Sequence, residues 1–429
     1  MRYGLAICTL ALLVGTAPAA TLRVPSQYAT LIAALDVAAD LDTVLVAPGT
    51  YSYTETRTLT LWDGPEEVTS AGFVSSDVVL ISEGGAGVTS LEPAQVAGSQ
   101  GVLMVSGTAA PTVEGFRIVS PGGGTGIWVD AGSFEVRDCR FEAALPQDGW
   151  GLFRTWGSSV VIGCTFDGLA TAVVHHGASL RMVDCVVSDC SGFFGAVHVN
   201  PGPYPYVNPI LIVRDTEFRN NHGSYWSGAV STPSYTVQGE TFSVSGSVTD
   251  CTFTENTSDG DGGAVLLTDG TLYRNVFLRN SAGGSGGAVH LTQRGFVKWN
   301  TFHRNSSSGG TGSALYVSGS GLIEVFRNIF SRQAGFLAFA AIQATNMPRG
   351  CNLFWNNEDG DMNLPLAATD LQADPLYCDA PRDDLTVADN SPAAWNTPGC
   401  GQIGALGPGC GAISVESESW GRIKGRYRN

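Results

Sequence analysis

The chain has 429 residues and a formal net charge of −16, and only 14% of its residues are charged. Such an acidic chain lacks the basic surface that a nucleic-acid backbone requires, which excludes nucleic acid as a partner. Its 55 glycines suit strands joined by tight turns better than helices or disordered chain.

Residues 1–19 are typical of a secretory signal peptide. An early arginine precedes an apolar run from Leu5 to Val14, and small residues at Ala17 and Ala19 predict cleavage after Ala19. No later stretch has the roughly 18 to 20 apolar residues of a transmembrane segment. We therefore expect a secreted or cell-surface protein, in which disulfides can form among the nine cysteines that follow the signal.

Residues 20–60 have the pattern of an N-terminal cap. The stretch "YATLIAALDVAADLDTVLVAPGTYS" predicts an amphipathic helix from about Tyr28 to Ala39, followed by a strand and a glycine turn. A helix in this position would cover the apolar end of the first repeat that follows.

Residues 61–365 repeat with a period near 24. Phenylalanine recurs at 253, 277, 302, 330 and 354, with spacings of 24, 25, 28 and 24 residues. The same frame extends upstream through Phe218, Val187, Phe166, Phe141 and, more loosely, Ile118. A repeat of this length indicates a solenoid built from stacked supersecondary units.

A second column of residues stands two positions before each aromatic residue. It contains Cys139, Cys164, Cys185, Thr216, Cys251, Asn275, Asn300, Asn328 and Asn352. Alternation along a strand puts this column on the same face as the aromatic column, and stacked asparagines can satisfy one another when buried. The short strands between glycine turns predict an all-β, single-stranded parallel β-helix of about 10–12 coils. The crossover preference makes it right-handed.

Two further motifs recur in register with the aromatic column. Asparagine follows the aromatic residue by three positions at 221, 256, 280, 305 and 357, and "SGAV", "GGAV", "GGAV" and "GSAL" end at 230, 265, 289 and 315. From about residue 215 to 360 these copies resemble the F-x-x-N and G-G-A-[ILV] repeats of chlamydial polymorphic outer membrane proteins. The N-terminal cap segment is similar to the opening of secreted pectin-lyase-like β-helix proteins.

The segment 366–413 resembles the closing cap of secreted bacterial β-helix proteins. It contains Cys378, Cys400 and Cys410, among which we expect one disulfide without being able to choose the pair. Residues 414–429 form a tail with a basic end, which is either a sorting or attachment signal or a disordered terminus.

Four aspartates lie in glycine-rich turns. Asp259 and Asp261 stand in "DGDGG", and Asp359 and Asp361 stand in the matching turn four coils later. Asp-Gly pairs suit turns that need positive φ, so we interpret these residues as turn formers. Bound Ca²⁺ is the alternative, and it is the only cofactor that the sequence suggests.

A column of acidic residues precedes the aromatic column by three positions. Asp184, Asp215 and Asp250 belong to consecutive coils and are followed by Arg274. The arrangement resembles the acidic Ca²⁺ stack and basic residue of pectate-lyase-like enzymes, which would make these four residues catalytic. The alternative is a repeated aspartate at strand entry that accepts hydrogen bonds from backbone amides.

Two coils are longer than their neighbours, at 31 and 35 residues, and the extra residues fall at the same phase. The loops "NPGPYPYVNP" and "STPSYTVQGE" should therefore lie side by side, with Phe193 and Phe194 in a preceding turn. The candidate ligand-binding residues here are Tyr204, Tyr206, Tyr225, Trp226 and Tyr235.

Three functions fit these patterns. The first is binding or adhesion to a glycan or a surface partner through the aromatic loops. The second is a polysaccharide lyase or glycoside hydrolase that acts on acidic polysaccharide through the aspartate column. The third is a structural envelope protein, and the fold alone does not choose among them.

Overall fold

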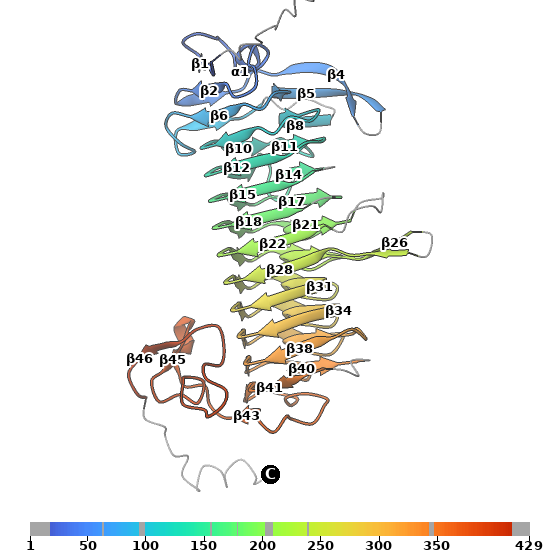
Figure 1. The fold of residues 1–429 in the computed structure, drawn as a ribbon, viewed down its shortest axis with the longest axis vertical. Helices are drawn as coiled ribbons and strands as arrows, with labels where there is room; N and C mark the ends of the chain where they lie inside the picture. The colour runs from blue at the N-terminus through green and yellow to red at the C-terminus, as the bar shows by residue number, and fades with distance from the viewer. Residues whose placement is uncertain are drawn as a thin grey trace, which may run out of the picture.

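The computed structural model describes residues 18–61, 64–93, 99–154, 157–177, 179–201, 209–237, 240–342 and 347–413. Parallel strands from successive turns of the chain stack into long sheets that surround one apolar core (Figure 1). The predicted all-β, parallel β-helix fold is therefore confirmed. Most of the predicted signal peptide and the whole C-terminal tail lie outside the described residues.

Most coils contribute a strand to each of three faces. The first face begins at β5 (Gly64–Val74), whose second half pairs with β8. It continues through β8 (Ser99–Val105), β11 (Thr125–Val129), β14 (Trp150–Arg154), β17 (Thr171–His176), β21 (Val197–Asn200), β25 (Val230–Thr232), β31 (Val265–Tyr273), β34 (Val289–Lys298), β37 (Leu315–Val317) and β40 (Phe339–Ala341). The strand β4 (Glu55–Leu61) forms an antiparallel hairpin with β5 at the N-terminal end.

The second face joins the first without a break at β31 and β34, because each of these strands is long enough to span both faces. Its other strands are β1 (Thr21–Val24), β2 (Thr43–Val46), β6 (Val79–Ser82), β9 (Thr112–Glu114), β12 (Phe134–Arg137), β15 (Ser159–Ile162), β18 (Leu180–Val183), β22 (Ile210–Arg214), β28 (Ser245–Thr249), β38 (Ile323–Phe326) and β41 (Arg349–Gly350).

The third face is a separate sheet of 13 strands in the described part of the chain. Its strands are β3 (Gly49–Tyr51), β7 (Thr89–Leu91), β10 (Arg117–Ser120), β13 (Arg140–Ala143), β16 (Thr165–Asp167), β19 (Val186–Ser188), β23 (Glu217–Arg219), β29 (Thr252–Thr254), β32 (Val276–Leu278), β35 (Thr301–His303), β39 (Ile329–Ser331), β42 (Leu353–Trp355) and β43 (Leu371–Gln372). A short ladder follows it, made of β20 (Ser191–Gly192), β24 (His222–Gly223), β30 (Thr257–Ser258), β33 (Ser281–Ala282) and β36 (Ser306–Ser307).

The aromatic column of the sequence repeat forms the inner wall of the third face. From Phe218 to Phe354 the rings stack nearly parallel, with centroids 4.8 to 5.1 Å apart. Those rings are at most 1% exposed. The spacing matches the separation of neighbouring strands, so residues of equal phase necessarily meet.

The asparagines that precede this column form a buried ladder. Asn300 shows the pattern: its Oδ1 accepts hydrogen bonds from the backbone nitrogen and the Nδ2 of Asn275, at 2.9 and 3.0 Å. Its own Nδ2 donates to Asn328 Oδ1 at 3.0 Å and to the Leu272 carbonyl at 2.9 Å. In the coils from Asn275 to Asn352 each asparagine thus donates to the side-chain oxygen of the next one, which is what makes a buried asparagine tolerable.

A parallel ladder follows the aromatic column by three residues. It passes through Asn221, Asn256, Asn280, Asn305 and Gln333, in which each backbone nitrogen donates to the side-chain oxygen of the next coil. In the coils from Cys139 to Cys251 the column before the aromatic residue holds four thiols and the hydroxyl of Thr216 instead. Cys139, Cys164, Cys185 and Cys251 are buried and unpaired.

The N-terminal helix is shorter than predicted. Helix α1 spans Leu31–Leu35, a single turn whose Thr30 hydroxyl accepts a hydrogen bond from the Ala33 nitrogen at 3.1 Å. Beyond it Asp42 receives the amides of Ala20 and Ala39, so the chain bonds to neighbouring segments instead of continuing the helix. The expected helical cap from Tyr28 to Ala39 is therefore not supported.

The C-terminal segment folds back along the outside of the coils. It carries β44 (Tyr377–Asp379), the 3-10 turn Ala380–Arg382, β45 (Asp384–Ala388) and β46 (Pro408–Cys410). Its residues Val387, Ala393, Ala394 and Ile403 pack against Ile329 and Leu353 of the third face. Figure 1 shows this segment, in orange and red, beside the last coils.

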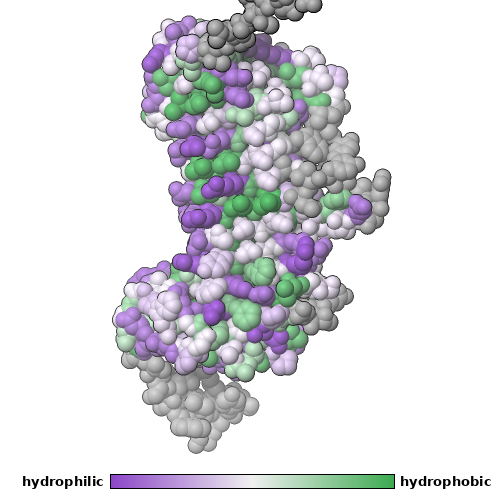
Figure 2. All heavy atoms as spheres, viewed as in Figure 1, coloured by the Kyte–Doolittle hydropathy of each residue, from purple (hydrophilic) through white to green (hydrophobic). Residues whose placement is uncertain are grey.

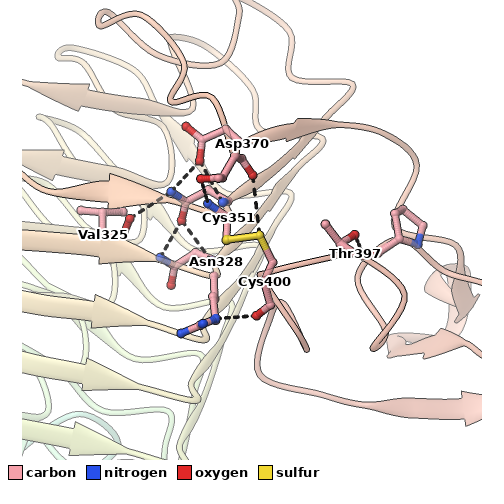
Figure 3. Close-up of a disulfide and its surroundings, with 10 residues drawn as sticks. Val325, Asn328, Cys351, Asp370, Thr397 and Cys400 are labelled. Atoms are coloured by element: carbon pink, nitrogen blue, oxygen red, sulfur yellow. Dashed lines mark hydrogen bonds between the residues drawn. A yellow bond between two sulfur atoms is a disulfide. The ribbon is translucent and has the colours of Figure 1, made fainter.

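Two disulfides fasten this segment. Cys378 bonds Cys410 within it, and Cys400 bonds Cys351, a residue of the last coils that the sequence did not offer as a partner. Figure 3 shows the second bond next to Asp370, whose carboxylate ends the first asparagine ladder by accepting from Asn352.

Candidate functional site

An aromatic cluster lies on the outside of two neighbouring coils, in the turns that lead into the first face. Phe193 follows β20 and Tyr225 follows β24. Because these turns have equal phase, the two rings stack, with centroids 4.9 Å apart and planes 5° from parallel. The side chains are 54% and 58% exposed, so they offer two adjoining flat apolar faces to solvent.

The base of the cluster is a buried histidine. His198 packs between Phe194 and Trp226, with ring centroids 4.6 and 5.9 Å away, and its Nδ1 is 2.8 Å from the Ser231 hydroxyl. Burial lowers the pKa of His198 to about 3. The imidazole is therefore neutral at physiological pH, and the cluster is suited to apolar contact instead of proton transfer.

A hairpin projects from the coil that carries Tyr225 and Trp226. Strands β26 (Tyr235–Val237) and β27 (Glu240–Phe242) pair antiparallel and stand clear of the barrel (Figure 1). Tyr235 is 52% exposed and lies opposite Phe242 in this pairing. The other two predicted tyrosines of the long loops, Tyr204 and Tyr206, lie outside the described residues.

The acidic column occupies a left-handed turn between the second and third faces. Asp184, Asp215 and Asp250 have φ of 56°, 49° and 54°, and Arg274 follows in the same column at 56°. All four side chains are exposed, and hydrophilic side chains line this edge of the coils in Figure 2. Aspartate tolerates this backbone region better than most residues, which explains its recurrence without invoking chemistry.

Two carboxylates of this column form ion pairs with arginines. Asp215 contacts Arg214 at 2.8 Å and Asp250 contacts Arg274 at 3.1 Å. Among the described residues no group of three or more His, Cys, Asp or Glu side chains is arranged to hold a metal ion. The three aspartates therefore form a row of exposed turn residues.

The aspartates of the glycine-rich turns are engaged by neighbouring coils. Asp261 Oδ1 accepts from the Ser285 nitrogen at 2.6 Å, and its Oδ2 lies 3.2 Å from His290 Nδ1. Asp259 Oδ2 lies 3.7 Å from His222 Nε2. These contacts join adjacent turns of the solenoid.

The matching turn at the last coils shows the same use of carboxylates. Asp361 accepts from Asn357 at 2.9 Å and from Gln372 at 2.5 Å. Asp359 is exposed in this turn. Both Asp361 oxygens therefore serve contacts within the chain.

One comparison with known proteins identifies the repeat. Residues 250–268 match the model of the Chlamydia polymorphic membrane protein repeat. The match runs from the left-handed turn at Asp250 through β29 and β30 into β31, which is most of one coil. No protein with curated annotation is similar enough in sequence to count as a relative.

The described part of the chain has no helix that is long and apolar enough to cross a membrane. In the coil that begins at Asp250, the β-helix is similar to the Chlamydia polymorphic membrane protein repeat.

Proposed function

We propose that the protein is a secreted or cell-surface binding protein that attaches to a glycan or a surface partner through its aromatic cluster. The observation that supports this function most directly is the exposed stack of Phe193 on Tyr225. Apolar rings of this size are normally buried, and a pair held open to solvent on a rigid scaffold is typical of a binding surface.

The chemistry of the cluster favours a sugar over a charged ligand. The CH faces of a pyranose ring stack on aromatic rings, and the neutral His198 beneath the cluster adds no charge. The hairpin β26–β27 supplies a further exposed ring, Tyr235, at the edge of the same coil. The stacked coils hold these side chains in place, so little ordering is needed on binding.

Repeats of the matched type support a location at the cell surface. The matched model describes a membrane protein repeat, and the N-terminal residues have the pattern of a secretory signal. The polysaccharide lyase alternative gains no support from the exposed, arginine-paired aspartate column.

The test compares variants that lack the aromatic rings with the wild type. Binding is measured on a glycan array and on intact cells of the organism that produces the protein. Replacing Phe193 and Tyr225 together by alanine should weaken attachment by about 1 kcal/mol or more per lost stacking contact, roughly 5-fold each. The triple change Tyr204→Ala, Tyr206→Ala and Tyr235→Ala tests the loops separately.

Tyr53→Ala is the matched control, because this tyrosine is equally exposed, at 58%, but lies near the N-terminal end. Thermal midpoints should stay within about 1 °C for all variants, since the rings lie outside the coil core. If wild type and the Phe193/Tyr225 double variant give the same binding curve on a ligand that wild type binds, the proposal fails.

A further inference from the structure

A second concave surface lies between the coils and the folded-back C-terminal segment. This groove has a volume of about 510 Å³. Tyr273, Arg274, Trp299 and Arg327 line it from the coils, and Trp395 and Gln402 line it from the opposite side. Arg274 also belongs to the turn column that the sequence singled out, whereas Trp299, Arg327 and Trp395 belong to none of the candidate sites named from the sequence.

Aromatic rings form much of the groove. Tyr273 and Trp299 belong to successive coils, and their ring centroids lie 5.1 Å apart. On the other side Trp395 is 70% exposed. An indole held this open next to a groove has no role in the core, and its flat face is available for stacking.

Two arginines place positive charge in the groove beside these rings. Arg274 and Arg327 stand in the left-handed turn column that is acidic in earlier coils. Arg274 Nε lies 3.1 Å from Asp250 Oδ1 and shares its charge with that carboxylate, whereas Arg327 has no carboxylate partner among the described residues. Arg327 lies over the Trp299 ring at 4.9 Å, and its Nε donates to the Cys400 carbonyl at 2.6 Å. No described residue accepts a hydrogen bond from its Nη atoms, so that edge of the guanidinium is free to bind a carboxylate.

The walls of the groove are tied together covalently and by hydrogen bonds. Cys400 is bonded to Cys351 in the coils. The Gly404 nitrogen donates to the Arg327 carbonyl at 2.8 Å, and the Ala405 nitrogen donates to the Thr301 hydroxyl at 3.0 Å. The rings and arginines are therefore held at fixed separations before any ligand arrives, which favours binding.

We propose that this groove binds an acidic sugar, a uronate unit of a polysaccharide, by stacking its ring on Trp395 and pairing its carboxylate with Arg327 and Arg274. Rings alone would suit neutral sugars, and arginines alone would suit any anion. Their combination in one groove selects a ligand that has both a flat apolar ring face and a carboxylate. This site is independent of the aromatic cluster at Phe193.

The test measures binding of tetragalacturonate and of the neutral maltotetraose to the purified mature protein by titration calorimetry. Wild type should bind the acidic tetramer at least 10-fold more tightly than the neutral one, and added salt should weaken the acidic complex only. Trp395→Ala should weaken the acidic complex at least 10-fold. Arg274→Asn, which keeps a side chain suited to positive φ, should weaken it and reduce its salt dependence.

Tyr53→Ala, which removes an exposed ring near the N-terminal end, should bind the acidic tetramer like wild type. The inference is overturned if wild type does not prefer the acidic tetramer. It is also overturned if Trp395→Ala, with an unchanged thermal midpoint, binds as tightly as wild type.

Discussion

The coils before and after Arg274 differ in three columns at once, although the backbone path is the same. The column before the aromatic residue changes from thiols, ending at Cys251, to asparagines, beginning at Asn275. The two left-handed turn columns change in the same coil, from acidic residues such as Asp250 and Glu255 to Arg274 and Arg279.

This difference shows that the parallel ladder tolerates different side-chain chemistry at equivalent positions. The thiols hold their place by size and weak contacts, such as that of Cys164 Sγ with the Val136 carbonyl at 3.7 Å. The asparagines link every coil to the next by several strong hydrogen bonds. The C-terminal coils are thus joined more specifically, and they are also the coils on which the C-terminal segment docks.

The charge change has a structural consequence as well. Arg279 binds the carboxylate of Asp383 in the C-terminal segment, at 3.0 Å through one of its two contacts. An acidic residue at the position of Arg279, as Glu255 is one coil earlier, would repel that carboxylate. The positive charge of Arg279 in this turn column therefore helps to determine where the C-terminal segment docks.

The largest expected effect comes from breaking the asparagine ladder. Asn300→Leu removes the acceptor for two Asn275 donors and leaves the Leu272 carbonyl without its partner, all in a buried layer. The free energy of unfolding should fall by about 3 kcal/mol. Denaturant titration followed by circular dichroism measures this, and an unchanged midpoint would show that the ladder adds no stability.

A smaller effect is expected when asparagine replaces a cysteine of the column before the aromatic residue. Cys251→Asn extends the ladder by one coil, because Asn275 Oδ1 already accepts from the Cys251 nitrogen at 3.0 Å. The same change at Cys164 places an amide between Cys139 and Cys185, which are poor partners. We expect Cys251→Asn to change stability by less than about 0.5 kcal/mol and Cys164→Asn to cost about 1–2 kcal/mol.

If Cys251→Asn and Cys164→Asn lost the same amount of stability, the interpretation that the asparagine ladder can begin only next to Asn275 would be contradicted. Cys164→Ala serves as the control for volume, since it removes the sulfur without adding a buried polar group.

The smallest predicted effect concerns docking of the C-terminal segment. Arg279 lowers the pKa of Asp383, chiefly through their hydrogen bonds. A lowered carboxyl pKa stabilises the docked state above the pKa of the free side chain, and this stabilisation is lost as pH falls through the lowered value. Because the pair is largely exposed, Arg279→Gln should cost less than about 1 kcal/mol.

Hydrogen exchange of the amides in Asp384–Ala388 should report this change. Wild type should lose protection as the pH falls below the ordinary pKa of an aspartate side chain, about 3.9, whereas Arg279→Gln should show less protection at neutral pH and a flatter pH dependence. The same pH profile in both proteins would exclude a role for the pair.

The candidate surfaces were only partly accessible from the sequence. Equal phase was enough to group Tyr225 and Trp226 with the turn of Phe193 and Phe194, because residues one period apart must stack in a solenoid. His198 beneath them gave no signal, since its partner Ser231 lies 33 residues away in a column where the residue type changes from each coil to the next. The groove at Trp395 joins two parts of the chain that no period relates.

The sequence by itself determined the parallel β-helix, its aromatic stack and its asparagine ladders, because each ladder contact joins residues of equal phase. The tertiary structure alone decided the short N-terminal helix, the Cys351–Cys400 bond and the docking of the C-terminal segment on the third face. The contacts of that segment join residues as far apart as Arg279 and Asp383, separated by 104 positions. Such contacts depend on shape and charge at one place in the fold, so no periodic or local pattern encodes them.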